Sequence, residues 1–126
     1  MSEIKKPMLA QTCKDVTALE FPVLATPKLD GIRCLVIGGK ALSRKCKEIP
    51  NRYIQTCVSK LPDGLDGELM LRDASEPFQA VTSAVMKGEG TPDFVYNVFD
   101  YVKGNLFWPY KTRMWDLQCL RLPKFV

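Results

Sequence analysis

Hydrophobic and polar residues alternate along the chain in short blocks, and the period of each block predicts a strand or a helix. Strands are predicted where β-branched and apolar residues form short runs, at residues 21–25, 34–37, 41–42, 65–71 and 94–102. Gly38-Gly39 lies between the second and third of these runs and predicts a tight hairpin turn.

Three other stretches have the period of a helix. The first begins at Pro50-Asn51, carries Ile54, Cys57, Val58 and Leu61 at i, i+3, i+4 and i+7, and ends at Pro62-Asp63-Gly64. The second begins near Pro77 with Phe78, Val81 and Val85 on one face, and the third covers about residues 111–121. Together these elements predict an α+β fold with largely antiparallel strands and packed helices.

The C-terminal residues predict an incomplete domain. Phe125-Val126 looks like the opening of a further strand, and no capping segment follows it. A sheet that stopped there would leave an edge strand uncovered. We therefore expect residues 1–126 to be one part of a larger domain.

Composition excludes several classes of protein. With 46% hydrophobic and 25% charged residues, the chain is typical of a globular protein rather than a disordered one. Its five cysteines include no CxxC pair and it has no histidine, so we expect reduced cysteines, no Cys/His zinc site and no histidine catalysis. The sequence has no signal or transmembrane segment, which favours the cytoplasm, that of a host cell, or the nucleus in a eukaryote.

The hexapeptide Lys28-Leu29-Asp30-Gly31-Ile32-Arg33 carries the strongest chemical signal. A lysine whose pKa is lowered by desolvation or nearby positive charge can attack the α-phosphorus of a nucleotide. Asp30 could orient the amine, Gly31 permits a close backbone approach, and Arg33 offers a guanidinium fork for ribose or phosphate. The alternative is a surface hairpin with a Lys/Asp pair and a solvated arginine.

Three further stretches could complete such a site. Asp66 and Glu68 lie two apart on a predicted strand, so both face one way and could hold Mg²⁺ indirectly and bind a ribose hydroxyl. Most such pairs are instead a turn acid and an exposed strand acid. Phe99 could stack on a purine, although a phenylalanine in such a strand is more often a core residue. Arg44, Lys45 and Lys47, with Arg52, form a basic cluster suited to phosphate contacts, although a charge run is usually a solvated face.

Taken in order, these residues resemble the ATP-dependent DNA ligases of the covalent nucleotidyltransferase superfamily. The matching motifs are KxDGxR at residues 28–33, Ser-Arg at residues 43–44, Asp-Gly-Glu at residues 66–68 and Phe-Asp at residues 99–100. The flanking sequences at residues 21–28 and 82–86 resemble those of the small ligases of Chlorella viruses and bacteriophages. The resemblance implies an ATP-grasp-like adenylation domain with mainly antiparallel sheets, acting as a monomer on nicked duplex DNA.

The resemblance also implies a role for each matching residue. Lys28 would be the nucleophile that becomes adenylated. Thr26, Pro27, Lys28, Arg33, Glu68 and Phe99 would bind ATP, with Glu68 on the ribose, Phe99 stacked on adenine, and Asp30 and Asp66 as auxiliary groups. Arg44, Lys45 and Lys47 would contact DNA, with Arg44 on the 5′-phosphate. Mg²⁺ would accompany the nucleotide, with Glu68 as a candidate ligand.

The sequence departs from this family after Phe99-Asp100. The family's later Glu-Gly motif, Lys-x-Lys motif and OB-fold domain have no counterpart in residues 101–126. We therefore expect the 126-residue chain to ligate nothing alone and to self-adenylate poorly or not at all. The alternatives are an RNA ligase, a capping-type nucleotidyltransferase, or a non-catalytic remnant that binds nucleic acid or a partner protein.

Overall fold

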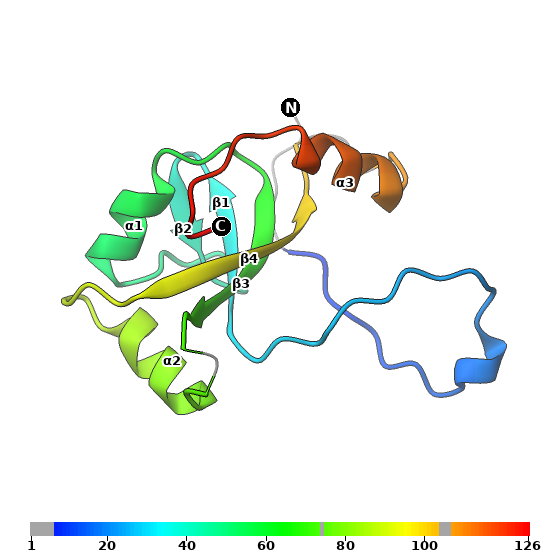
Figure 1. The fold of residues 1–126 in the computed structure, drawn as a ribbon, viewed down its shortest axis with the longest axis horizontal. Helices are drawn as coiled ribbons and strands as arrows, with labels where there is room; N and C mark the ends of the chain where they lie inside the picture. The colour runs from blue at the N-terminus through cyan, green and yellow to red at the C-terminus, as the bar shows by residue number, and fades with distance from the viewer. Residues whose placement is uncertain (1–6, 74, 104–106) are drawn as a thin grey trace.

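The fold is a four-stranded antiparallel sheet with three α-helices, seen in a computed structural model that describes residues 7–73, 75–103 and 107–126. The strand order is β2-β1-β3-β4, with bounds Ile32–Ile37 for β1, Lys40–Leu42 for β2, Leu65–Leu71 for β3 and Phe94–Tyr101 for β4. The helices are α1 (Arg52–Val58), α2 (Phe78–Met86) and α3 (Tyr110–Gln118), with a 3-10 turn at Val16–Ala18 (Figure 1). The predicted α+β class is confirmed.

One face of the sheet builds the hydrophobic core. Alternate residues of the strands point into it, because side chains along a strand alternate between the two faces. The buried members include Cys34, Val36, Leu65, Leu69 and Tyr96 from the strands, Ile54 and Val58 from α1, and Val81 and Val85 from α2. Helices α1 and α2 thus cover this face, as their apolar spacing predicts.

The intervening strand residues carry charge on the opposite face. Arg33 of β1 lies directly across from Glu68 of β3, and Asp66 lies two residues before Glu68 on β3. Helix α3 packs beside β4 (Figure 1). The alternation of side chains along the strands therefore places apolar residues in the core and charged residues on the opposite face of the sheet.

A β-bulge interrupts the pairing of β3 with β4 beside this charged surface. Asp66 pairs with Asp100 but Gly67 pairs with Val98, so Phe99 is an extra residue without a partner across the ladder. Gly67 makes this close approach possible, because a β-carbon there would overlap the carbonyl oxygen of Asn97. The bulge is therefore fitted to a glycine in the neighbouring strand.

The predicted strand at residues 21–25 is wrong. Between residues 7 and 31 the chain instead runs out from the body and back as a long arm, with the 3-10 turn far from the sheet (Figure 1). Phe21, Val23 and Leu24 are 67%, 46% and 69% exposed. An apolar run forms a strand only where another strand offers backbone partners, and the described residues offer none at this position.

Three smaller differences concern helix α2, the C-terminus and the end of helix α3. Phe78 is half exposed rather than buried beside Val81 and Val85. Phe125-Val126 is not a strand, although the Phe125 carbonyl accepts a 2.6 Å hydrogen bond from the Tyr96 amide. Helix α3 ends at Gln118, three residues before the predicted end. None of the helices in the described part of the chain has the length and apolar character needed to cross a membrane.

Candidate active site

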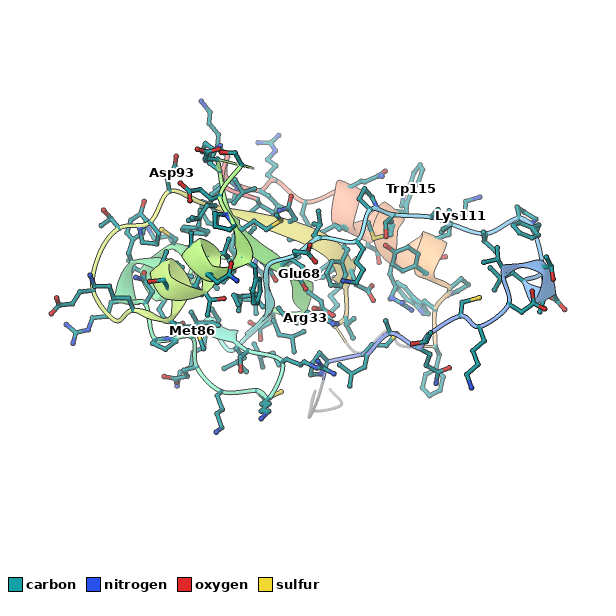
Figure 2. The ribbon with its side chains drawn as sticks, turned by 90° about the horizontal axis from the view of Figure 1, so that it is seen from below. Arg33, Glu68, Met86, Asp93, Lys111 and Trp115 are labelled. Atoms are coloured by element: carbon teal, nitrogen blue, oxygen red, sulfur yellow. The ribbon has the colours of Figure 1, made fainter. Side chains whose placement is uncertain are left out.

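A cavity of about 1300 Å³ lies over the charged face of the sheet, where Arg33 and Glu68 point (Figure 2). Its walls come from the arm, β1, the turn after β2, β3, β4 and α3. The lining includes Thr26, Pro27, Lys28, Asp30, Arg33, Arg44, Lys45, Asp66, Glu68 and Phe99. Residues far apart in the chain therefore meet in one place.

Lys28 stands at the mouth of this cavity. Its side chain is 90% exposed, and its Nζ atom lies 3.5 Å from the Oδ1 atom of Asp30. A lysine amine attacks phosphorus only in its neutral form, which has a lone pair on nitrogen. Lys28 is therefore accessible to a nucleotide phosphate, while activation as a nucleophile requires further groups around it.

Glu68 links β3 to the turn that carries Lys28. Its Oε2 atom accepts a 3.1 Å hydrogen bond from the Gly31 amide. A β-carbon at Gly31 would overlap the Leu69 carbonyl oxygen, so the turn can approach β3 this closely only with glycine. Burial raises the pKa of the Glu68 carboxyl, although the Gly31 amide and the Arg33 guanidinium oppose the shift.

This raised pKa predicts a pH-dependent stability difference between the wild type and Glu68→Gln. Ionising Glu68 costs more in the folded chain than in the unfolded chain. The stability that its protonated form contributes is complete below the ordinary carboxyl pKa and is lost as pH rises through the folded value. Glutamine does not ionise, so Glu68→Gln should gain stability relative to wild type as pH rises from the ordinary carboxyl pKa of about 4.3 through the raised pKa of the folded chain.

Urea unfolding across that pH range measures the difference, because pH-independent effects of the substitution cancel in the trend. Glu76→Gln, at an exposed position, is the matched control and should follow wild type at every pH. If the difference in free energy of unfolding between Glu68→Gln and wild type stays constant, or shifts in favour of wild type with rising pH, the pKa of Glu68 is not raised by folding.

The partly buried Arg33 and the buried Asp66 form an ion pair on the floor of the cavity. The guanidinium donates to both carboxylate oxygens, at 2.6 and 2.7 Å, and also to the Met8 carbonyl at 2.7 Å. It lies 5.0 Å from the centre of the Phe99 ring, within cation–π range. Burial raises the pKa of Asp66 despite the opposing Arg33 charge, and the hydrogen bond from Arg33 to Asp66 raises the pKa of Arg33.

The basic cluster divides between the cavity and its surroundings. A turn closed by a 2.7 Å hydrogen bond from the Ser43 amide to the Lys47 carbonyl presents Arg44 and Lys45 to solvent at the cavity rim. Lys47 and Arg52 do not line the cavity. The predicted cluster is therefore a basic rim of two residues with two further cations outside it.

Three residues of the cavity were not anticipated as a group. Asp100, Tyr110 and Arg113 line its α3 side, and Arg113 binds Asp100 through distances of 2.8 and 3.2 Å. The available signal is Arg113 at i−4 from Leu117, on the inward face of a helix that follows a strand with an aspartate near its end, Asp100. A buried charge is stable only when it is paired, so an arginine on a buried helix face requires a carboxylate partner, and Asp100 is a nearby candidate in the sequence.

The described residues do not form a dedicated metal site. They contain no group of three or more histidine, cysteine, aspartate or glutamate side chains arranged to hold a cation. Asp66 is engaged by Arg33 and Asp100 by Arg113, which leaves Glu68 and the exposed Asp30 as the cavity carboxylates that could face a shared ion. Mg²⁺ commonly binds through one or two carboxylates together with substrate phosphates, so these residues could share an ion with a nucleotide but not hold it by themselves. None of the five cysteines, all within the described part, forms a disulfide.

The fold of this chain is similar to that of solved DNA ligase structures. A crystal structure of Chlorella virus DNA ligase-adenylate superposes with a TM-score of 0.84 at 38% identity, over 92% of this chain and 42% of the ligase. The chain is a structural relative of DNA ligases. A second structure of that Chlorella virus ligase-adenylate gives a TM-score of 0.83 at 39% identity, over 92% of this chain and 42% of that chain.

The similarity to DNA ligases extends to a more distant structure. One described as Pmar-Lig_Pre matches with a TM-score of 0.53 at 27% identity, over 72% of this chain and 25% of that chain. No family model and no curated protein matches the sequence. The predicted DNA ligase resemblance and the adenylation-domain fold are confirmed, and the chain spans less than half the length of the Chlorella virus ligase.

Proposed function

We propose that this chain acts as the first part of an ATP-dependent DNA ligase adenylation domain. The observation that carries the proposal is the convergence of Lys28, Glu68, Phe99 and Arg44 on one cavity. The 38% identity to Chlorella virus DNA ligase-adenylate over 92% of this chain supports the same activity. The polypeptide that follows in the relative would supply the remaining contacts to the nucleotide phosphates.

The first chemical step would be nucleotidyl transfer to Lys28. The neutral Nζ atom attacks the α-phosphorus of ATP, an N–P bond forms, the bond to the bridging oxygen of the β-phosphate breaks, and pyrophosphate leaves. The nitrogen gives up a proton in the process. AMP then passes to the 5′-phosphate of a nick, and the 3′-hydroxyl displaces it to join the strands.

Each cavity residue has a separate task in this proposal. Glu68 accepts a hydrogen bond from the ribose, and the Phe99 ring stacks on adenine. Arg33 contacts one face of the Phe99 ring, and its ion pair with Asp66 forms the floor of the pocket. Mg²⁺, when bound with ATP, neutralises phosphate charge.

Nick sealing by a chimaera tests the substrate class. Residues 1–126 joined to the part of the Chlorella virus ligase that has no counterpart here should seal nicked duplex DNA with ATP. We expect no sealing by the 126-residue chain alone, and none with GTP. Sealing of nicked RNA in preference to DNA would instead identify an RNA ligase, and GTP-dependent labelling a capping-type enzyme. DNA binding without sealing by the chimaera would identify a non-catalytic binding module.

The basic rim predicts salt-dependent DNA binding. Replacing the rim residues Arg44 and Lys45 together with the neighbouring Lys47 by alanine should weaken nicked-DNA binding, because cations that bind phosphates release counterions from the DNA. The slope of log affinity against log salt should fall by about 0.9 for each phosphate that is no longer neutralised. Alanine at Lys60, Lys87 and Lys124 makes the same charge change away from the cavity and is the control. Equal weakening in both triple variants, measured by fluorescence anisotropy, would contradict a specific role for the rim.

A further inference from the structure

The β-bulge places Phe99 outside the regular hydrogen-bond ladder of the sheet. Phe99 has no partner in β3, because Asp66 pairs with Asp100 and Gly67 with Val98. A bulge re-aims the side chain that it carries, but it also removes the ladder pairing that would fix that residue. The orientation of the Phe99 ring must therefore be set by groups other than β3.

Helix α3 supplies those groups on the backbone side of Phe99. The Tyr110 hydroxyl donates a 2.5 Å hydrogen bond to the Phe99 carbonyl. The next residue, Asp100, is held by two guanidinium nitrogens of Arg113, and the third Arg113 nitrogen donates to the Trp108 carbonyl at 2.8 Å. The first turn of α3 thus forms hydrogen bonds to both Phe99 and Asp100.

The ion pair between Arg113 and Asp100 is buried and makes further contacts. Arg113 is 6% exposed and Asp100 is 5% exposed. Asp100 also accepts a 2.8 Å hydrogen bond from the Tyr101 amide, and the Arg113 guanidinium lies 5.6 Å from the centre of the Tyr110 ring. Burying two charges is costly, and an apolar pair of the same volume would often anchor a helix equally well. The position of this pair at the bulge therefore suggests a role in geometry.

We propose that Tyr110 and Arg113 are positioning residues that hold the Phe99 ring ready for stacking on a nucleobase. Arg33 restrains the ring itself, while Tyr110 and Arg113 restrain the backbone from which it projects. A ring fixed before the ligand arrives saves the free energy of ordering it on binding. The inference rests on the proposed nucleotide role of Phe99 and deepens it by naming the residues that prepare the stacking surface.

Fluorine NMR tests the positioning directly. With 4-fluorophenylalanine at position 99, Tyr110→Phe removes only the hydroxyl, and Arg113→Lys keeps the charge but loses the fork. Both variants should shift or broaden the fluorine resonance. Tyr53→Phe and Arg121→Lys make the same chemical changes at exposed positions that do not line the cavity, and their spectra should superpose on wild type.

Calorimetric titration with ATP and with inorganic tripolyphosphate then separates the base from the phosphates. Tyr110→Phe and Arg113→Lys should weaken ATP binding by about three- to tenfold, the effect of one net hydrogen bond, and leave tripolyphosphate binding unchanged. A general structural defect would instead weaken the binding of ATP and of tripolyphosphate together, and it would lower the midpoint of unfolding.

The outcomes distinguish this inference from the proposed function. If wild type binds ATP but the variants keep its fluorine spectrum or its ATP affinity, the positioning role is wrong and the proposed function stands. The positioning role is equally wrong if ATP and tripolyphosphate lose affinity in parallel. If saturating ATP leaves the wild-type fluorine resonance unmoved, the nucleotide role of Phe99 is wrong, and the inference falls with it.

Discussion

Lys28→Arg will abolish the covalent AMP adduct and nick sealing in the chimaera while leaving ATP binding within about threefold of wild type. Arginine keeps the positive charge that attracts the nucleotide phosphates. Its guanidinium stays protonated at all accessible pH values, so it has no lone pair with which to attack phosphorus. Radiolabelled ATP followed by denaturing electrophoresis measures the adduct.

Two controls make the Lys28 result specific. Lys60→Arg, at an exposed position that does not line the cavity, should form the adduct and seal nicks as wild type does. A nick whose 5′-phosphate already carries AMP bypasses the first two steps, so the Lys28→Arg chimaera should still seal it. Adduct formation by Lys28→Arg at the wild-type rate would rule out Lys28 as the nucleophile.

Arg33→Met will lower the free energy of unfolding at pH 7 by about 3–5 kcal/mol, the cost of removing one partner from a buried ion pair. Asp66 is 2% exposed, so its carboxylate would remain buried without the guanidinium that now contacts both of its oxygens. Burial already raises the pKa of Asp66, and losing Arg33 would raise it further. The destabilisation should therefore shrink as pH falls and Asp66 becomes protonated.

Urea unfolding of a short series of variants checks this prediction. Arg33→Met/Asp66→Asn should recover much of the lost stability, because the buried charge is gone. Arg72→Met is the matched control, since it breaks an ion pair with Asp93 whose side chains are 53% and 76% exposed, and should cost less than about 1 kcal/mol. Equal destabilisation in Arg33→Met and Arg72→Met, or no recovery in the double variant, would contradict a buried-charge origin.

The charged face of the sheet was largely predictable from sequence. Asp66 and Glu68 share a face because strand side chains alternate, and the structure brings both to the cavity with Arg33. The glycine beside Lys28 was expected to permit a close approach, and Gly31 lies against Glu68 and Leu69. These features depend on the alternation of side chains along a strand and on the position of a glycine, and both can be read from the sequence.

Other features depend on contacts between distant segments and could not be read in this way. Residues 21–25 have the composition of a strand, but no described strand pairs with them. The bulge at Phe99 arises from the register of β3 against β4, which a single strand does not encode. Tyr110 and Arg113 acquire their partners only because α3 folds back beside that bulge.

Mapping the modified peptide tests most directly whether Lys28 accepts AMP from ATP. The chimaera is incubated with ATP and Mg²⁺, digested, and analysed by tandem mass spectrometry. We expect one acid-labile AMP adduct, on Lys28 and absent from Lys28→Arg. An adduct on a different residue, or DNA sealing with Lys28 unmodified throughout, would contradict the role of Lys28 as the nucleophile.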